Sequence, residues 1–219
     1  MVNLEKSSVS GFKSLEVPYI LLRSGVPTRN LAIMLPGAGY TTQAPLFHYT
    51  TELFLNRGWD VLEVNYQYNL SAYADFTMDE LAGIIRYDVR TVIDEVLAKE
   101  SYGHFTLISK SLGTLAMCSE RGRKAFQTAR LIWLTPLIHR DDVLEAMVQS
   151  SQPGLAVIGD QDHCYSEDRY RELSANPLLA ASLVPGIGHG FDYAGDVQKS
   201  IDALKDVLSD IEEFALEEE

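Results

Sequence analysis

The stretch that decides the fold is Thr106-Leu107-Ile108-Ser109-Lys110-Ser111-Leu112-Gly113-Thr114-Leu115-Ala116. Its first residues are apolar and β-prone, and its last residues are compatible with a helix. Between them lies the pattern small-x-Ser-x-small, in which Ser109 and Gly113 are the small residues. Such a pattern suits a sharp strand-to-helix turn, because a bulky side chain at either small position would clash with neighbouring backbone. Ser111, at the tip of that turn, is therefore a candidate nucleophile.

Short β-rich runs alternate with longer helical stretches along the rest of the chain. Strands are predicted at 17–22, 31–35, 60–65, 105–109, 131–135, 155–159 and 179–184. Most of these runs are almost continuously apolar, as expected for parallel strands that are covered on both faces. The segment 4–22 holds two possible strands with no helix between them, so the sheet is expected to start with an antiparallel edge. The pattern predicts one α/β domain over residues 1–219, with helices on both faces of a mostly parallel sheet.

Helices fill the stretches between several of these strands. They are predicted from near Leu46 to Gly58, after the capping box Thr77-x-x-Glu80, over 141–149 and over 201–215. Only the segment 136–153 separates the predicted strand 131–135 from the next one. That segment has room for about one helix, so no large lid is predicted there.

Composition excludes several classes of function. The chain has 219 residues, of which 46% are hydrophobic and 22% charged, as in an ordinary globular protein. A formal net charge of −13 argues against nucleic acid or an anionic membrane as a partner. No apolar run reaches the roughly 18 residues of a membrane span. The polar start, residues 1–13, lacks the apolar core of a secretion signal, and two cysteines do not make a disulfide framework, so a cytoplasmic location is expected.

Polar residues follow four of the predicted strands at the edge where open α/β sheets gather their chemistry. Pro36-Gly37-Ala38-Gly39-Tyr40 follows the first of these strands, and Ser111 follows the second. Gly159-Asp160-Gln161-Asp162-His163 follows the third, and the loop containing Gly188-His189-Gly190 follows the last. Nucleophile, acid and base therefore occur in the order Ser, Asp, His, each just past the end of a strand.

These motifs resemble those of the α/β hydrolases. The resemblance covers nearly the whole chain from Pro36 and rests on the elbow Ser109-Lys110-Ser111-Leu112-Gly113, the Gly159-x-x-Asp162 turn and the Gly188-His189-Gly190 turn. The compact layout is similar to dienelactone-hydrolase-like and small carboxylesterase members, with serine as the nucleophile. Two departures stand out: Ser109 replaces a frequent glycine, and Pro36 stands where histidine is frequent. Neither departure removes a reacting group.

The resemblance implies a role for each residue. His189 would act as the general base for Ser111, and Asp162 would orient the imidazole and stabilise its cation. The backbone N–H of Leu112, together with that of Ala38 or Gly39, would form the oxyanion hole. No cofactor is implied, and the expected partner is a small-molecule acyl substrate.

Two alternatives concern the acid turn. Asp160 lies two residues before Asp162 and competes for the role of the acid, although the spacing typical of the family favours Asp162. Asp160, Asp162, His163 and Cys164 also have metal-ligating side chains. They mix hard and soft ligands and lack a second spaced ligand pair, so no metal site is predicted.

The expected substrate pocket is shallow and aromatic. The predicted wall around a small or medium acyl group is the loop 66–76, beginning with Tyr66, together with Tyr40, Phe47 and Phe191. Lys110 either attracts a carboxylate-bearing substrate or, as is favoured, pairs with an acidic side chain. The predicted function is a serine hydrolase that cleaves an ester or thioester through an acyl-enzyme. The alternatives are a small peptidase, and a binding or scaffold module that keeps the fold without turnover.

Overall fold

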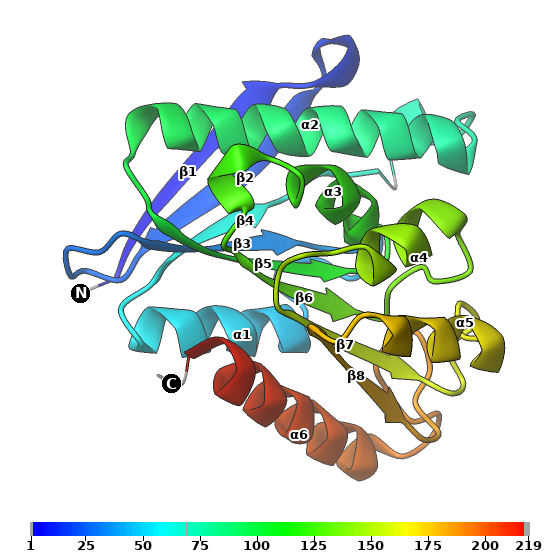
Figure 1. Cartoon of the computed structure of the whole chain (residues 1–219). Helices are drawn as coiled ribbons and strands as arrows, with labels where there is room; N and C mark the ends of the chain where they lie inside the picture. The colour runs from blue at the N-terminus through cyan, green and yellow to red at the C-terminus, as the bar shows by residue number, and fades with distance from the viewer. Residues whose placement is uncertain (1, 69, 217–219) are drawn as a thin grey trace.

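A computed structural model describes residues 2–68 and 70–216, and these residues form a sheet of eight strands (Figure 1). The strands are β1 (Asn3–Ser10), β2 (Glu16–Arg23), β3 (Asn30–Leu35), β4 (Asp60–Val64), β5 (His104–Lys110), β6 (Arg130–Leu134), β7 (Gly154–Gly159) and β8 (Leu179–Val184). Their order in the sheet is β1-β2-β4-β3-β5-β6-β7-β8. β1 pairs antiparallel with β2, and β2 pairs antiparallel with β4, whereas the remaining pairs are parallel. The predicted mixed sheet with an antiparallel N-terminal edge is confirmed.

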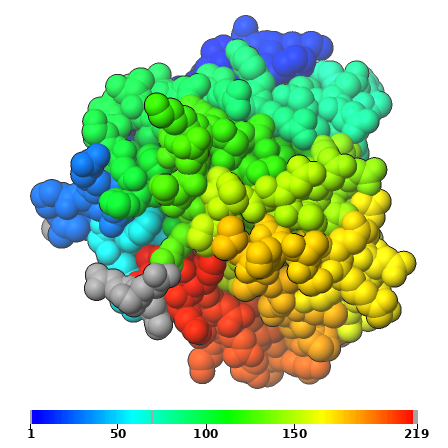
Figure 2. All heavy atoms as spheres, in the orientation of Figure 1, coloured from blue at the N-terminus to red at the C-terminus, as the bar shows by residue number. Residues whose placement is uncertain are grey.

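Helices cover both faces of this sheet, as predicted. They are α1 (Pro45–Asn56), α2 (Met78–Lys99), α3 (Gly113–Glu120), α4 (Asp141–Val148), α5 (Glu167–Glu172) and α6 (Val197–Leu216). Figure 1 shows α1 and α6 against one face and α2, α3 and α4 against the other. In the space-filling view of Figure 2, α6 and the segment with α5 and β8 pack directly against the rest of the chain.

Two apolar cores result from the alternation of side chains along the buried strands. In β3, Leu31, Ile33 and Leu35 belong to the core beneath α2, α3 and α4. Ala32 and Met34, on the opposite face of the same strand, belong to the core beneath α1 and α6. All five side chains are fully buried. This double coverage explains why the strand is apolar at every position from Leu31 to Leu35.

The capping box that the sequence predicts at the start of α2 is present. The Thr77 Oγ1 accepts a hydrogen bond from the Glu80 N–H at 3.3 Å, and the Glu80 carboxylate accepts one from the Thr77 N–H at 2.8 Å. Each predicted strand lies within one residue of its observed bounds at either end. Only α4 stands between β6 and β7, where a lid would be inserted. Within residues 2–68 and 70–216, no helix is both long enough and apolar enough to cross a bilayer.

Candidate active site

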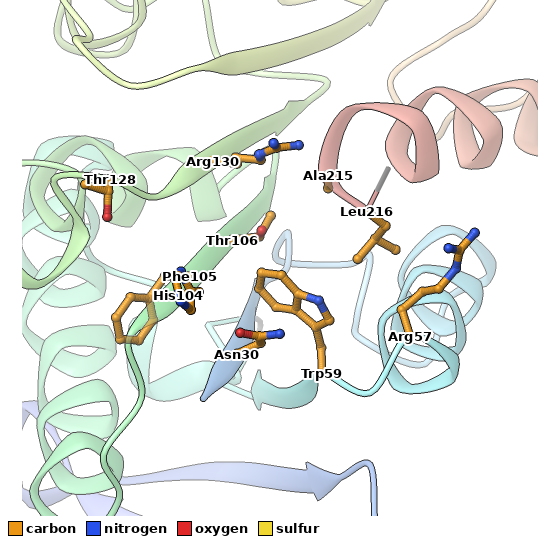
Figure 3. Close-up of a pocket in the computed structure, with 10 residues that line it drawn as sticks. All are labelled: Asn30, Arg57, Trp59, His104, Phe105, Thr106, Thr128, Arg130, Ala215 and Leu216. Atoms are coloured by element: carbon orange, nitrogen blue, oxygen red, sulfur yellow. The ribbon is translucent and has the colours of Figure 1, made fainter. Parts of the chain in front are cut away.

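The edge at which the parallel strands begin carries a cavity of about 960 Å³ (Figure 3). Two arginines lie on its wall, but Arg57 is paired with Glu212 at 2.7 Å and Arg130 donates to the carbonyl of Phe214. Both arginines are thus committed to contacts with α6. None of the ten residues that line this cavity is a carboxylic acid, so the lining lacks the acid that a catalytic triad requires. The candidate site lies at the opposite edge, where the strands end.

The turn at Ser111 is a strained strand-to-helix elbow. Ser111 has a φ of +51°, in the left-handed region that favours glycine, and its N–H donates to the Leu134 carbonyl at 3.1 Å. A Cβ atom on Gly113 would lie 2.0 Å from the carbonyl oxygen of Leu35. Only glycine therefore fits at the second small position of the motif. Ser109, at the first small position, is fully buried, and its Oγ donates to the Ile132 carbonyl at 3.4 Å.

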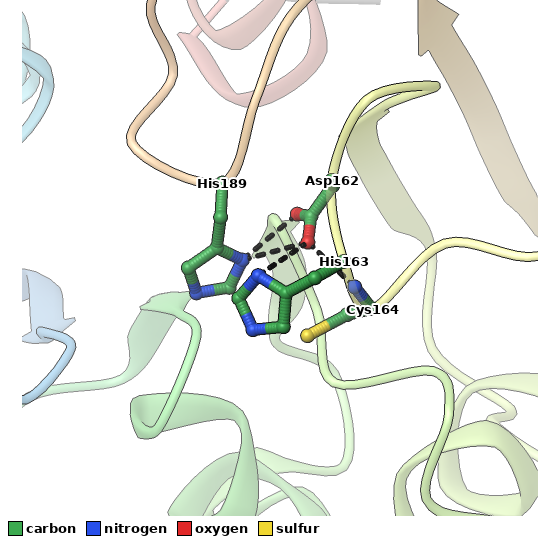
Figure 4. A group of neighbouring side chains, drawn as sticks. All are labelled: Asp162, His163, Cys164 and His189. Atoms are coloured by element: carbon green, nitrogen blue, oxygen red, sulfur yellow. Dashed lines mark hydrogen bonds and ion pairs between the residues drawn. The ribbon is translucent and has the colours of Figure 1, made fainter.

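Ser111, His189 and Asp162 form a continuous chain of hydrogen bonds. The Nε2 of His189 lies 2.7 Å from the Oγ of Ser111, and its Nδ1 lies 2.9 Å from both carboxylate oxygens of Asp162 (the His189–Asp162 contact is drawn in Figure 4). With Asp162 ionised, Nδ1 carries the proton and donates it, which leaves Nε2 free to accept from the serine hydroxyl. The Asp162 side chain is fully buried, whereas that of His189 remains 24% exposed. The imidazole of His189 is thus accessible from solvent and the carboxylate of Asp162 is not.

The surroundings of Asp162 favour its ionised form. Burial alone would raise the pKa of this carboxyl, but hydrogen bonds from His189 and from the Cys164 N–H outweigh it, and the pKa lies below its ordinary value. The Cys164 N–H donates at 2.8 Å. Asp160 points elsewhere: its Oδ1 accepts from the Gly186 N–H at 2.7 Å and braces the start of the histidine loop, residues 185–196. Of the two acids, only Asp162 contacts His189 among the described hydrogen bonds.

The loop after β3 approaches Ser111 closely. A Cβ atom on Gly37 would lie 3.2 Å from the Cβ of Ser111, and the Gly37 N–H is used in a turn with the Tyr40 carbonyl. The N–H groups of Ala38, Gly39 and Leu112 have no acceptor among residues 2–68 and 70–216. The predicted oxyanion donors are therefore free to bind a negative oxygen, and their role stays a prediction.

Most of the predicted pocket residues are interior side chains. Tyr66 is 7% exposed, Phe191 5% and Lys110 1%, and Phe47 is fully buried, whereas Tyr40 is half-buried. The Tyr66 hydroxyl donates to the carbonyl of Pro36, so this residue holds the loop after β3 rather than forming an open wall. Phe191 packs in the core beneath α1 and α6. Tyr66 and Phe191 are therefore engaged in packing and leave little surface for a substrate. Of Tyr40, Tyr66 and Phe191, only Tyr40 remains a candidate for contact with the substrate.

Lys110 requires a correction. Neither sequence-based interpretation fits, because its ammonium faces neither solvent nor a carboxylate partner within the described ion pairs. The Nζ donates to the Thr135 Oγ1 at 2.9 Å and to the His189 carbonyl at 2.7 Å. It also lies 4.5 Å from the centroid of the Tyr40 ring. The Lys110 side chain thus points into the protein, where its ammonium contacts three neutral groups that are distant from it in sequence: the Thr135 hydroxyl, the His189 carbonyl and the Tyr40 ring.

His163 is a neighbour of the site that the sequence marked only as a loop residue. Its side chain is 73% exposed, and its ring centroid lies 4.5 Å from that of His189. The donor atoms of Asp162, His163, Cys164 and His189 all lie within 4.8 Å of one another (Figure 4). Two of them already bind each other in the triad, and burial raises the pKa of the Cys164 thiol to about 12, so it stays protonated. We therefore treat this group as part of the triad's surroundings.

The fold and the site together define the architecture of the α/β hydrolases. No protein-family model matches the sequence, and no curated protein has a similar sequence. Solved structures do match. They include an α/β serine hydrolase homologue from Coxiella burnetii, with 16% identity over 94% of this chain and 97% of the other and a TM-score of 0.70. The esterase Pf2001 from Pyrococcus furiosus matches with 14% identity, coverage of 97% and 91% and a TM-score of 0.72.

A third match bears on the missing lid. XC6422 from Xanthomonas campestris, an α/β serine hydrolase without a lid, shares 16% identity over 99% of this chain and 97% of its own, with a TM-score of 0.69. At these low identities the similarity establishes the fold alone. The chain has the α/β-hydrolase fold, and the solved structures that match it include one without a lid. The resemblance that the sequence motifs suggested is confirmed at the level of the fold.

Proposed function

We propose that this protein is a serine hydrolase that cleaves a carboxylic ester or thioester through an acyl-enzyme on Ser111. The observation that carries the proposal is the hydrogen-bonded chain from the Ser111 Oγ through His189 to Asp162, at 2.7 Å and 2.9 Å. A serine hydroxyl is a weak nucleophile until a base removes its proton, and here the base lies within hydrogen-bond reach and is oriented by a buried carboxylate. The same three residues occur in the order and at the strand ends that the α/β-hydrolase fold uses.

The reaction would proceed in two halves. The Ser111 Oγ attacks the acyl carbonyl while His189 Nε2 takes its proton, and the resulting oxyanion is bound by the N–H groups of Leu112 and of Ala38 or Gly39. His189 then returns the proton to the leaving alcohol or thiol, and the acyl group remains on the serine. A water molecule, activated by the same imidazole, releases the acid and restores the hydroxyl. Asp162 stabilises the imidazolium that forms in each half.

The openness of the site suggests a small or medium acyl group. Only α4 separates β6 from β7, and the His189 side chain is 24% exposed, so a substrate is enclosed on few sides. One structure with the same fold is that of ferulic acid bound to Est1E from Butyrivibrio proteoclasticus, at 15% identity and a TM-score of 0.63. A panel of p-nitrophenyl esters and acyl-CoA thioesters of graded chain length, with a feruloyl ester added, would define the preference.

We further propose that residues 1–219 form a single domain in the cytoplasm.

An active-site-directed probe tests the nucleophile. A fluorophosphonate should label the wild type at Ser111 and leave Ser111→Ala unlabelled, because the probe phosphonylates only an activated serine. Ester hydrolysis should fall by at least about a thousandfold in the same variant. Labelling that persists in Ser111→Ala would reject the assignment of the nucleophile. A wild type that is folded but never labelled would favour the binding or scaffold module instead.

A further inference from the structure

Lys110 is a charged residue in an interior position, directly before the nucleophile. It is the last residue of β5 and is 1% exposed, although lysine is almost never fully buried without a partner. The described ion pairs give it no carboxylate. A buried ammonium that is not hydrogen-bonded is strongly unfavourable, so the structure around Lys110 must satisfy its donors.

Those donors are satisfied by three different loops at the carboxyl edge of the sheet. The Nζ donates to Thr135, which follows β6, and to the carbonyl of His189 in the loop after β8. The third direction faces the ring of Tyr40, in the loop after β3, at cation–π distance. Thr135 itself has a φ of +39°, so its hydroxyl is presented from a strained backbone. One side chain thus links the loop of the base, the loop of the predicted oxyanion donors and the strand of the nucleophile.

The histidine loop needs such a link. Residues 185–196 contain no helix or strand, and the imidazole must stay within 2.7 Å of the Ser111 Oγ to accept its proton. The Asp160 contact to Gly186 holds one end of the loop, and the Gly188 N–H donates to the Asp192 carbonyl inside it. Of these three backbone contacts in the loop, only the one from Lys110 is made to His189 itself. A displacement of about 1 Å at a reacting group costs up to about 100-fold in rate.

We propose that Lys110 is a positioning residue, whose ammonium fixes the carbonyl of His189 and thereby holds the imidazole against Ser111. This inference rests on the proposed function, because it assigns Lys110 a role in the same triad. The contact is charge-assisted and its acceptors are neutral, so the ammonium is the only charge in the link. Its loss weakens the hold on the histidine loop without removing any reacting group.

The protonation of Lys110 provides a readout that a structural role would not give. Burial lowers the pKa of Lys110 to about 8, against the opposing effects of Asp162, Cys164 and Asp192. The ring of Tyr40 and the backbone carbonyl of His189 also face the ammonium. The charged form is the one that binds the loop. Activity should therefore fall as the pH passes about 8 and Lys110 becomes neutral.

Lys110→Met and Lys110→Gln test the proposal with an activated ester and with the fluorophosphonate. We expect kcat to fall by about 10- to 100-fold in Lys110→Met with little change in KM, together with a matching fall in the rate of probe labelling. The melting temperature should not fall, because an apolar replacement of a buried charge is often neutral or stabilising. The alkaline decline should disappear in both variants. The low-field proton resonance of His189 Nδ1 should shift or broaden in Lys110→Met.

Thr135 supplies a matched pair that leaves Lys110 in place. Thr135→Val removes the acceptor at almost constant shape, and Thr135→Ser keeps it, so the serine variant should have several-fold higher kcat than the valine variant. Wild-type kcat and an unchanged alkaline limb in Lys110→Met would overturn the proposal. If Lys110→Met fails to fold, equal activities in the Thr135 pair would overturn it. A wild type that the probe does not label would instead reject the proposed hydrolase function, which keeps the two failures distinct.

Discussion

Ser111 is one of three non-glycine residues with left-handed backbone that gather at the carboxyl edge of the sheet. Ser111, Thr135 and Phe191 have φ values of +51°, +39° and +65°. Each such conformation costs on the order of 1 to 3 kcal/mol and persists only where the surrounding structure requires it. All three belong to the turns that carry or adjoin the triad, so the site is held in place by the two cores and not by the preferences of its own residues.

The choice between the two acids is a prediction at the scale of single residues. Asp162→Asn should lower kcat for p-nitrophenyl acetate by about 10³- to 10⁴-fold, because an amide favours the wrong tautomer of His189 and cannot stabilise its cation. Asp160→Asn should stay within about tenfold of the wild type, since its side-chain oxygen can still accept from the Gly186 N–H. Circular dichroism of both variants controls for folding. A greater loss in Asp160→Asn would contradict the assignment.

At the scale of elements, the chain's local signals account for most of what was predicted. The central strands β3 to β7 were predictable because both of their faces are buried. Helix α2 was predictable because Thr77 and Glu80 mark its start. α5 was not predicted. It has six residues and no buried side chain, so it lacks the apolar periodicity that marks a helix. Its local signals are Ser166 at the N-cap and charged residues in its first and last turns, which are weak without that periodicity.

The cap of α2 gives the prediction at this scale. Thr77→Ala should lower the free energy of unfolding by about 1 kcal/mol, because it removes the side-chain acceptor for the Glu80 N–H and half of the capping box. Thr91→Ala, at a half-buried position in the middle of the same helix, is the matched control and should be neutral or slightly stabilising. Urea denaturation of both variants measures the difference. Equal stabilities would mean that the cap contributes nothing.

At the scale of the whole molecule, the sequence predicted that Ser111, Asp162 and His189 lie together, but it did not predict the contacts of the residues packed around them. Ser111, His189 and the turn with Asp160 and Asp162 were identified because each follows the end of a strand, and parallel strands end at one edge. The choice of Asp162 over Asp160 came from the spacing typical of the α/β hydrolases. The position of β2 beside β4 and the burial of Lys110 depend on contacts between segments far apart in the chain. Nothing in the stretch around Lys110 announces that its acceptors come from Thr135 and His189.

The left-handed backbone of Ser111, Thr135 and Phe191 also has a consequence for the order of events during folding. Because their conformations are imposed by packing on both faces of the sheet, the site should be the last part of the protein to form during refolding. We expect far-ultraviolet circular dichroism to recover before fluorophosphonate labelling after dilution from urea, with labelling returning in the slowest phase. Labelling that recovers together with the helical signal would show that the elbow forms locally. On this view, reactivity at Ser111 reports that the entire chain has finished folding.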